Sequence, residues 1–350
     1  MIKVAHISAA NVWRGAEQQL HWLFNTDENG IENFLFCPEG SPLNERNKNK
    51  KAKIETYYKL AGIDLAGGWK LAKFIRTHQI QLLHLHDSHA LNLFWIAYAL
   101  GNRIPAVFHK HHNHPVKNKF KYNANPIKKI ICVSSAVYQT AAKQIAGNKL
   151  VIIQPGLQKN IPGGSSADLK KEFNLPADAK LIGTVCALEK EKNLFELVQI
   201  ANKFTSAGKS YFIIVGTGSY EKDLRNSIQE AGLGKKVLLA GFRNDVPQLL
   251  PQFDAFLFSS LSEGFPGVLL EAMRAKIPIV TRNSGGIPEM VSDGETAWFY
   301  HSVKEACEKL QFVLRENIDP QLEKASRSVD QYSVENMIQK THNLYKEICG

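Results

Sequence analysis

Short apolar runs alternate with longer amphipathic stretches along most of the chain. Runs such as residues 2–8 and 181–186 have the length and the β-branched content of buried strands. Stretches such as residues 15–25 and 193–207 repeat apolar positions at helical spacing. Strands that alternate with helices form parallel sheets with helices on both faces. The pattern therefore predicts an α/β fold.

The alternation occurs in two consecutive series. The first series predicts helices at residues 15–25, at 90–100 and from 135, and strands at residues 2–8, 33–37, 81–86, 106–109, 129–133 and 151–153. The second predicts helices at residues 193–207, at 221–231 and from about 267, and strands at residues 181–186, 211–215, 236–240, 255–259 and 278–281. We therefore expect two doubly wound, Rossmann-like domains.

A linker separates the two series. Residues 155–166 are rich in proline, glycine and serine, and a helix is expected from Ala167. The domains should cover residues 1–160 and 161–332, followed by a C-terminal helix over residues 333–350. A basic, polar segment at residues 46–53 is expected to be a surface loop.

Composition limits the class of protein. No apolar run reaches the ~20 residues that a membrane-spanning helix needs, and residues 1–7 enter a strand pattern without a signal-peptide core. The five cysteines are scattered and include no Cys-x-x-Cys pair, which indicates reduced thiols. We expect a cytoplasmic protein whose basic surface could still bring it to the inner face of an anionic membrane.

Charge is distributed unevenly between the two halves. The net charge is +10, but residues 1–155 hold 20 Lys and Arg against 9 Asp and Glu, whereas residues 156–350 hold 23 against 24. Ten of the 12 histidines also lie in the first half. The halves should therefore face different partners. No basic motif with interleaved aromatic residues is present, which disfavours nucleic acid.

The strongest chemical pattern is SEGFPGVLLEAM, residues 262–273, which follows the strand expected at 255–259. Its glycines and proline open a helix whose free N–H groups and dipole suit a phosphate. Glu263 lies just before this helix and Glu271 lies inside it, and carboxylates accept hydrogen bonds from sugar hydroxyls. An isolated pair of this spacing more often marks a capped helix with solvated carboxylates. In its context, the segment predicts a nucleotide-sugar site.

The segment resembles the glutamate-x7-glutamate motif of glycosyltransferase family 4, the group 1 glycosyltransferases of GT-B architecture. GTG at residues 216–218, GFRNDV at 241–246 and GGIPE at 285–289 stand in the family's order and spacing. The resemblance implies two Rossmann-like domains facing a central cleft, with the acceptor bound by the N-terminal domain and the donor by the C-terminal one. It implies that the C-terminal helix crosses back toward the N-terminal domain. It also implies transfer from a nucleotide-diphosphate sugar with retention of anomeric configuration, without a cofactor.

The resemblance assigns roles in the C-terminal half. Glu271 should hold the ribose hydroxyls, and Glu263 should contact the donor sugar. The donor pocket should be lined by Gly216, Gly264, Phe265, Pro266 and Gly267.

Two cations usually bind the diphosphate in this family. Lys192 matches the family's lysine, but Ala187 stands at the position of its arginine. Lys190 or another basic residue could substitute for it, whereas Arg243 is disfavoured because it follows a different strand.

In the N-terminal half, residues 11–17 resemble the family's glycine loop. Gly15 matches one glycine, and Arg14 stands where members often have another, so its charge could replace the missing arginine. By spacing from Pro105, His111 best matches the family's histidine that contacts the donor sugar, followed by His109. His84 and His86 end the neighbouring strand, and His86 and His109 are acceptor-side candidates.

The segment HKHHNH, residues 109–114, could also form a zinc site by composition. Alternation along a strand places His109 and His111 on one face. No cysteine or carboxylate lies nearby in the sequence to complete the ligand set, so we expect no metal.

The chain contains no Asp-x-Asp motif, so the helix dipole and a lysine should neutralise the leaving group. Retention could proceed by double displacement or by same-face attack, and the resemblance favours the second. We expect a retaining transferase that glycosylates a glycan or lipid-linked acceptor in cell-envelope polysaccharide or lipopolysaccharide synthesis. The alternative is a non-catalytic or hydrolytic nucleotide-sugar-binding protein, which Ala187 and the unusual glycine loop would suit.

Overall fold

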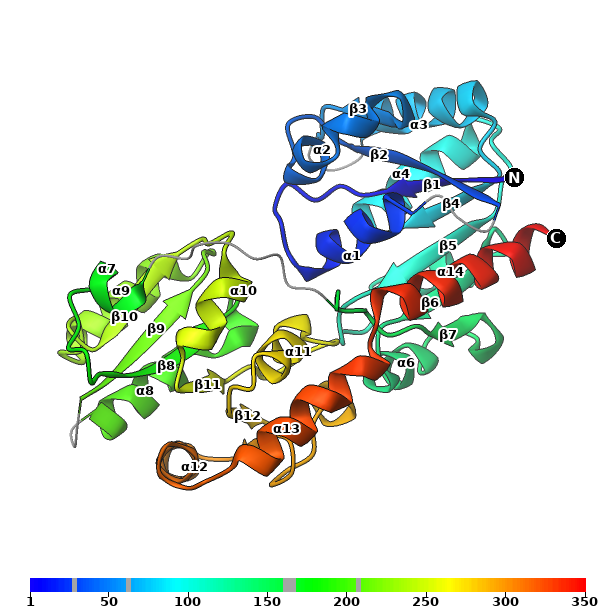
Figure 1. The fold of residues 1–350 in the computed structure, drawn as a ribbon. Coiled ribbons are helices and arrows are strands. Elements are labelled where there is room, and N and C mark those ends of the chain that lie inside the picture. Colours follow the sequence, from blue (N-terminus) through cyan, green and yellow to red (C-terminus); the bar gives the residue numbers. More distant parts are fainter. Residues whose placement is uncertain (27–29, 61–63, 160–167, 206–208) are drawn as a thin grey trace. The chain divides into compact units, whose positions relative to one another are not determined.

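The computed structural model describes residues 1–26, 30–60, 64–159, 168–205 and 209–350 (Figure 1). The chain forms two compact units, one of residues 1–156 with 332–350 and the other of residues 157–331. Residues 332–350 thus belong to the N-terminal unit. The linker residues 160–166 and the expected helix start at Ala167 lie outside the described residues.

Unit 1 contains a seven-stranded sheet in which every neighbouring pair is parallel. Strand β1, the third in spatial order, places Val4 beside Asn33 on one side and Leu82 on the other. In spatial order the strands are β3 (Ile54–Tyr57), β2 (Ile31–Pro38), β1 (Ile2–Ile7), β4 (Leu82–Leu85), β5 (Ala106–Lys110), β6 (Ile127–Cys132) and β7 (Leu150–Ile152).

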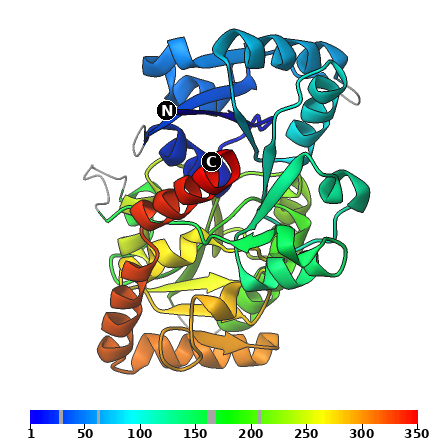
Figure 2. The ribbon, with the colours of Figure 1, turned by 90° about the vertical axis from the view of Figure 1, so that its right-hand side faces the viewer.

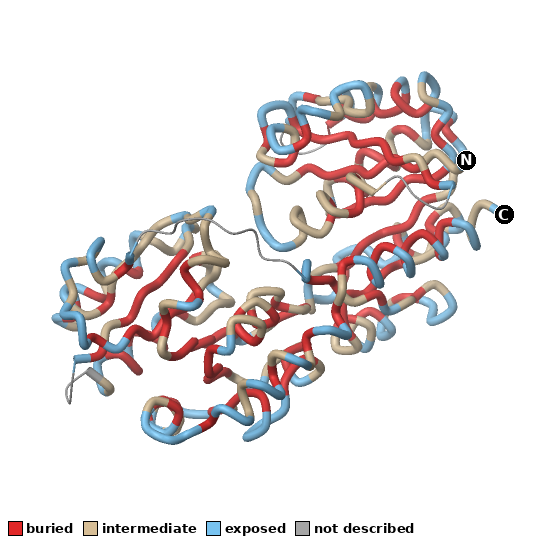
Figure 3. The backbone as a smooth tube through the Cα atoms, in the orientation of Figure 1, coloured by how far each residue is buried: buried red, intermediate tan, exposed pale blue. Residues whose placement is uncertain are grey.

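Helices cover the sheet of unit 1, as Figure 3 shows by the burial of its strands and the exposure of outer helix faces. Asp87 caps one of them by accepting hydrogen bonds from the backbone N–H groups of His89 and Ala90. The helices are α1 (Gly15–Phe24), α2 (Pro42–Arg46), α3 (Leu65–His78), α4 (Ser88–Ala99), α5 (Lys119–Asn123), α6 (Ser135–Ala142) and α14 (Val334–Cys349), with short 3-10 helices at Lys48–Lys53 and Gly147–Lys149.

The C-terminal helix α14 lies beside α1 in both views (Figures 1 and 2). Its residues Met337 and Tyr345 share one apolar cluster with Leu23 of α1 and with Val4 and Leu82 of the sheet. The burial of apolar side chains therefore attaches the end of the chain to the N-terminal sheet.

The expectation of a loop at residues 46–53 was wrong, because Lys48–Lys53 form a 3-10 helix. Asn47, which precedes this helix, is fully buried, and its amide donates to the carbonyl of Leu43 and accepts from Asn25. Lys50 Nζ donates to the Asn25 carbonyl as well. These bonds order a segment whose composition is that of a loop.

Unit 2 repeats the architecture with a six-stranded parallel sheet centred on β8 and β11. In spatial order its strands are β10 (Val237–Gly241), β9 (Ser210–Val215), β8 (Lys180–Val185), β11 (Ala255–Phe258), β12 (Ile279–Arg282) and β13 (Trp298–Tyr300). Its helices are α7 (Leu169–Glu172), α8 (Leu194–Thr205), α9 (Glu221–Glu230), α10 (Val246–Leu249), α11 (Gly267–Arg274), α12 (Val303–Arg315) and α13 (Asp319–Ser328). The predicted fold class, two doubly wound α/β units, is confirmed.

The strand orders locate the ligand-binding edges. In each sheet the chain reverses its winding direction between two central strands, β1 and β4 in unit 1 and β8 and β11 in unit 2. Ligands of such sheets bind outside the carboxyl ends of the strands at this point. The loops that follow these strands should therefore carry the site of each unit.

Candidate active site

Three loops at the carboxyl edge of the unit 2 sheet are fixed to one another. Ser259, which follows β11, donates through Oγ to the Lys192 carbonyl at 2.8 Å, and Ser260 donates to the Glu191 carbonyl at 3.1 Å. Ser284, which follows β12, donates to the Ser260 carbonyl at 2.7 Å. The loops that follow β8, β11 and β12 thus form one hydrogen-bonded assembly.

Two predicted site residues meet in this assembly. Lys192 Nζ lies 2.6 Å from Glu263 Oε1, and their side chains are only 19% and 9% exposed. The ammonium also lies 5.9 Å from the centre of the Phe258 ring. An ion pair this far removed from water requires both partners, because either charge left alone would be poorly solvated.

The backbone at Glu263 is fixed by the GGIPE segment. The Gly286 N–H donates to the Glu263 carbonyl at 3.0 Å. Gly285 has a φ of +55°, and a Cβ added there would lie 2.0 Å from the Glu263 oxygen. Only glycine fits both the conformation and the space.

We expect Gly285→Ala to lower both stability and activity, because the new methyl group would displace the Glu263 backbone. Gly294→Ala is the matched control, since Gly294 has a φ of +72° but a Cβ there would meet nothing within 4 Å. The left-handed conformation should cost each variant about 1–2 kcal/mol, as measured by denaturant unfolding. Gly285→Ala alone should lose more unfolding free energy than this, and it alone should have a lower kcat. Equal stability losses with unchanged activity in both variants would contradict this role of Gly285.

Helix α11 begins beside this pair without a side-chain cap. Its N-cap residue is Pro266, and a Cβ added at Gly267 would meet nothing within 4 Å. The first turn therefore presents N–H groups and open space, which suits an anion. Gly264 and Pro266 are buried, and Phe265 is half-buried.

Glu271 lies on the next turn of α11 and is half-buried. Burial raises the pKa of its carboxyl group to about 7. Across the part of the chain that the structure describes, no hydrogen bond or ion pair to this carboxyl group is found. The group is thus positioned to accept hydrogen bonds from a ligand.

Packing requires glycine at residue 216, in addition to the donor role expected for Gly216. Its φ is +136°, and a Cβ there would lie 1.9 Å from the Cys186 carbonyl oxygen. At Gly218 a Cβ would lie 2.3 Å from the Leu188 oxygen. Glycine therefore allows the turn after β9 to lie against the loop after β8.

The other cationic candidates lie in different surroundings. Lys190 is exposed in the same 3-10 turn as Lys192, two residues away, and Ala187 is half-buried. The Arg243 guanidinium pairs with Asp245 at 2.8 Å and with Glu172 at 2.9 Å. Because both carboxylates already bind the Arg243 guanidinium, this side chain is a poor candidate for a phosphate ligand, which agrees with its being disfavoured from the sequence.

Arg14 and Gly15 lie in unit 1, at the start of α1, and both are exposed. The Arg14 backbone N–H donates to the Glu17 carboxylate at 3.0 Å, and a Cβ at Gly15 would meet nothing within 4 Å. The expected compensation of Ala187 by Arg14 stays a prediction.

Unit 1 gathers five histidines at the carboxyl edge of its sheet. They come from β1 (His6), from β4 and the residue that follows it (His84, His86), and from β5 and the residue that follows it (His109, His111). Ring centres lie 4.1 Å apart for His84 and His86 and 4.2 Å apart for His109 and His111. Sequence reasoning missed His6, although its place at the end of the first strand could have indicated it.

Four of these imidazoles, those of His84, His86, His109 and His111, are held neutral. Burial lowers the pKa of His84, His86 and His111 well below the usual value and lowers that of His109 to about 3, and neighbouring histidines add to the effect. The Tyr345 hydroxyl lies 2.5 Å from His84 Nδ1, so α14 contacts the cluster directly.

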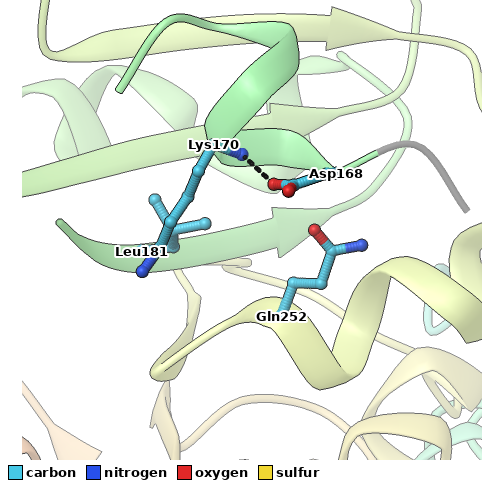
Figure 4. A pocket seen from close by; sticks show the side chains of 4 residues that line it. All are labelled: Asp168, Lys170, Leu181 and Gln252. Carbon is cyan, nitrogen blue, oxygen red and sulfur yellow. Dashed lines mark hydrogen bonds between the residues drawn. The ribbon is translucent and has the colours of Figure 1, made fainter. Parts of the chain in front are cut away.

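A surface hollow in unit 2 lies away from these loops. It is lined by Asp168, Lys170, Leu181 and Gln252 (Figure 4). Leu181 is the second residue of β8, so the hollow lies at the amino edge of the sheet. Parallel sheets bind ligands at the opposite edge, and the hollow is therefore not a candidate for the donor site.

Comparison with known families decides between the possible uses of this fold. Residues 21–159 match the family model described as Glycosyltransferase Family 4, and residues 165–331 match the one described as Glycosyl transferases group 1. The chain belongs to this glycosyltransferase family. The predicted family is thereby confirmed, and the chemistry of the protein is glycosyl transfer.

Relatives of this glycosyltransferase are named as transferases and synthases. UDP-Gal:alpha-D-GlcNAc-diphosphoundecaprenol alpha-1,3-galactosyltransferase of Escherichia coli is 26% identical over 81% of this chain and 80% of its own length. N-acetyl-alpha-D-glucosaminyl L-malate synthase of Bacillus anthracis is 22% identical over 81% of this chain and 79% of its own length. Both are transferases or synthases by name, which does not favour the alternative of a non-catalytic binding protein.

Solved structures confirm the GT-B fold of the glycosyltransferase. HepE from Anabaena, in complex with UDP and glucose, matches with a TM-score of 0.85 at 19% identity. The match covers 99% of this chain and 100% of the HepE chain. The lipopolysaccharide outer core galactosyltransferase WaaB has a TM-score of 0.72 at 16% identity, with coverage of 99% and 100%. Among the described residues, no helix has both the length and the apolar character that crossing a membrane requires.

Proposed function

We propose that the protein transfers a sugar from a UDP-sugar, with retention of anomeric configuration, to a hydroxyl of a glycan or lipid-linked acceptor in cell-envelope polysaccharide synthesis. The buried Lys192–Glu263 ion pair beside the uncapped start of α11 carries this proposal. It places a cation, free N–H groups and a carboxylate where a sugar diphosphate would need all three.

In this proposal the diphosphate binds at the N-terminus of α11 and draws the Lys192 ammonium from Glu263 toward its own oxygens. The ammonium and the helix dipole then stabilise the charge that develops on the leaving group. Since the sequence lacks an Asp-x-Asp motif, we assign this neutralisation to the protein alone, without a metal ion on the diphosphate. Lys190 lies in the same 3-10 turn as Lys192 and is assigned as the second cation for the diphosphate.

The nucleoside occupies the other side of the helix start, where the ribose hydroxyls donate to Glu271. The donor sugar faces Glu263, with Gly264, Phe265, Pro266 and Gly267 around the sugar and phosphate and Gly216 in the neighbouring turn. Gly15, Arg14 and His111 of unit 1 are assigned to the donor phosphates and sugar, and His86 and His109 to the acceptor side. These roles follow the family motif at each matching position.

We propose same-face attack for the chemical step. The acceptor oxygen bonds to the anomeric carbon on the face from which the diphosphate departs, the bond from that carbon to the phosphate oxygen breaks, and this oxygen takes the acceptor's proton. The Glu263 carboxylate, which pairs with Lys192 before the donor binds, is then an electrostatic partner of the sugar and not its nucleophile.

The uridine nucleotide is supported by two comparisons, the UDP-galactose named for the Escherichia coli relative and the UDP bound to HepE. A thermal-shift series with UDP, GDP and ADP tests it, since a ligand at 100 times its Kd stabilises by about 2.7 kcal/mol. UDP should raise the unfolding temperature, and GDP and ADP should not. An equal response to all three, or none to UDP, would overturn the proposed donor.

Contact with an anionic membrane is supported by exposed apolar side chains of unit 1 at α3 and shortly before it in the sequence, Tyr58, Leu60, Leu65 and Trp69, which we call the α3 patch. Leu65 and Trp69 are four residues apart and so share one face of α3, which continues to the exposed Lys73. Aromatic and basic side chains on one helix face are typical of interfacial membrane binding.

We expect Trp69→Ser to lower co-sedimentation with anionic phosphatidylglycerol vesicles about tenfold at low salt, the effect of exposing one buried aromatic side chain. Phe120→Ser is the matched control, because Phe120 is an exposed aromatic residue elsewhere on unit 1. Binding should also fall at high salt. Equal binding by both variants would contradict the α3 patch as the contact.

A further inference from the structure

A chain of hydrogen bonds fixes the tautomer of His86. Asn33 Nδ2 donates to the carbonyls of Leu23 and Thr26, so its Oδ1 faces His6 Nε2 as the acceptor, at 3.0 Å. His6 Nε2 therefore carries the proton, and His6 Nδ1 holds a lone pair. That lone pair accepts from His86 Nε2 at 3.1 Å. His86 Nδ1 consequently presents a lone pair on the far side of its ring.

Three histidines lie close together and contain buried ring nitrogens without partners among the described residues. His86 Nδ1, both ring nitrogens of His109 and His111 Nε2 are buried and have no hydrogen-bond partner within the described residues. One nitrogen from each of the three lies within 4.8 Å of the others. Buried polar atoms are nearly always paired, so such a group of lone pairs calls for a ligand.

A small cavity opens between these rings. His86, His109 and His111 line it together with Gln19, Leu20, Leu23, Met337 and Thr341, and about 10 Å³ is open to the centre of a water-sized sphere. That space accommodates about one water molecule or one ion.

We propose that His86, His109 and His111 bind one divalent transition-metal ion of the zinc class. Neutral imidazole is a preferred ligand of such ions, and three histidines with one water molecule complete a tetrahedral site. Zn–N bonds of about 2.0–2.1 Å place ligating nitrogens about 3.3 Å apart, so modest ring rotations would close the site. The His86–His6–Asn33 chain supplies the second-shell support that metal-binding histidines usually have.

A second group, His6, His84 and His86, also has ring nitrogens within 4.8 Å of one another. A metal ion there would have to break the bond between His6 Nδ1 and His86 Nε2. His84 also directs Nδ1 to the Tyr345 hydroxyl. Ligation by His86 through Nδ1 would leave its bond to His6 intact, which is why we assign the ion to the group of His86, His109 and His111.

The expectation of no metal rested on the lack of a third ligand near residues 109–114 in the sequence. The fold supplies that ligand from the neighbouring strand, because β4 and β5 are adjacent in the sheet. A bound ion would occupy the His111 imidazole that the proposed function assigns to the donor sugar. The metal-bound and sugar-contacting states would then exclude each other, a consequence that rests on the proposed function.

Equilibrium dialysis of the chelator-treated full chain against ZnCl2 tests the site. The wild type should bind one ion per chain, and His111→Ala should bind it at least ~100-fold more weakly, more than the loss typical of second-shell changes. His114→Ala, which removes an exposed histidine of the same segment, should bind as the wild type does. Absence of binding, or equal binding by all three proteins, would overturn the proposal.

Cobalt substitution of the wild type gives a second readout that needs no variant, in case His111→Ala fails to fold. Co2+ should produce the intense visible absorption of a tetrahedral site. Only the weak absorption of octahedral, hydrated Co2+ would overturn the proposal.

Discussion

Replacing Lys192 with alanine should lower kcat by about 10²–10³-fold, because the diphosphate would leave without its principal cation. The effect should be large because Ala187 stands where an arginine would share this task, and Arg243 is already paired with two carboxylates. Steady-state kinetics with a UDP-sugar donor measure it. Lys222→Ala is the control, since Lys222 is exposed on α9 in the same unit.

Loss of Lys192 would also leave the Glu263 carboxylate buried without a counter-ion, which could destabilise the variant by several kcal/mol. The double variant Lys192→Ala/Glu263→Gln removes that charge and separates stability from catalysis. It should unfold at a temperature nearer to that of the wild type and remain inactive. A kcat within about threefold of the wild type for Lys192→Ala would contradict the role of this cation.

Replacing Glu271 with glutamine should have opposite effects on binding and on stability. UDP should bind about 10–100-fold more weakly, because a neutral amide is a poorer acceptor for two ribose hydroxyls than a carboxylate. Above pH 7 the variant should be more stable than the wild type by about 1–2 kcal/mol, because the half-buried charge is gone. Calorimetric titration with UDP and denaturant unfolding at pH 5 and pH 8 measure the two effects.

The sign of the pH dependence follows from the pKa. The carboxyl group of Glu271 titrates at about 7 in the folded protein, above its ordinary value of 4.5. Between these values the folded state binds more protons than the unfolded state, so this group's contribution to stability falls as the pH rises. The affinity of the wild type for UDP should rise as the pH passes through about 7 and the carboxylate ionises.

Glu230→Gln is the control for both effects, since Glu230 is an exposed carboxylate at the end of α9. It should change neither the UDP affinity nor the pH dependence. A wild-type UDP affinity that is flat from pH 5 to pH 8 would contradict the placement of Glu271 against the ribose.

Much of the donor edge could be predicted from the sequence. Glu263 and Lys192 follow β11 and β8, and neighbouring strands of a parallel sheet end at the same edge. The helix expected from about residue 267 begins at Gly267 because Pro266 and the preceding glycine interrupt the chain. The unpartnered state of Glu271 could not be predicted, since it depends on which side chains surround the second turn of α11.

Other elements were missed for physical reasons. Helix α3 contains Gly67 and Gly68, and glycine weakens a helix pattern by about 1 kcal/mol relative to alanine. The structure explains Gly68, since a Cβ there would lie 2.3 Å from the side chain of Ile96 on α4. The contact between α3 and α4 thus requires glycine at residue 68, and the same glycine weakens the sequence pattern that would have predicted α3.

The histidine cluster, too, could be predicted only in part from the sequence. His109 and His111 could be paired from the alternation of a strand, but His6 and His86 join them only through the order in which β1, β4 and β5 lie in the sheet. Strand order depends on how the whole chain winds, which local pattern does not reveal.

The anomeric configuration of the product tests the central claim most directly. The wild type is incubated with a lipid-linked acceptor and a set of UDP-α-sugars, and proton NMR records the linkage of the sugar that is transferred. Retention predicts an α-linked product, with UDP released in equal amount and with product formed about 10²–10³-fold more slowly by Lys192→Ala. A β-linked product would contradict the account.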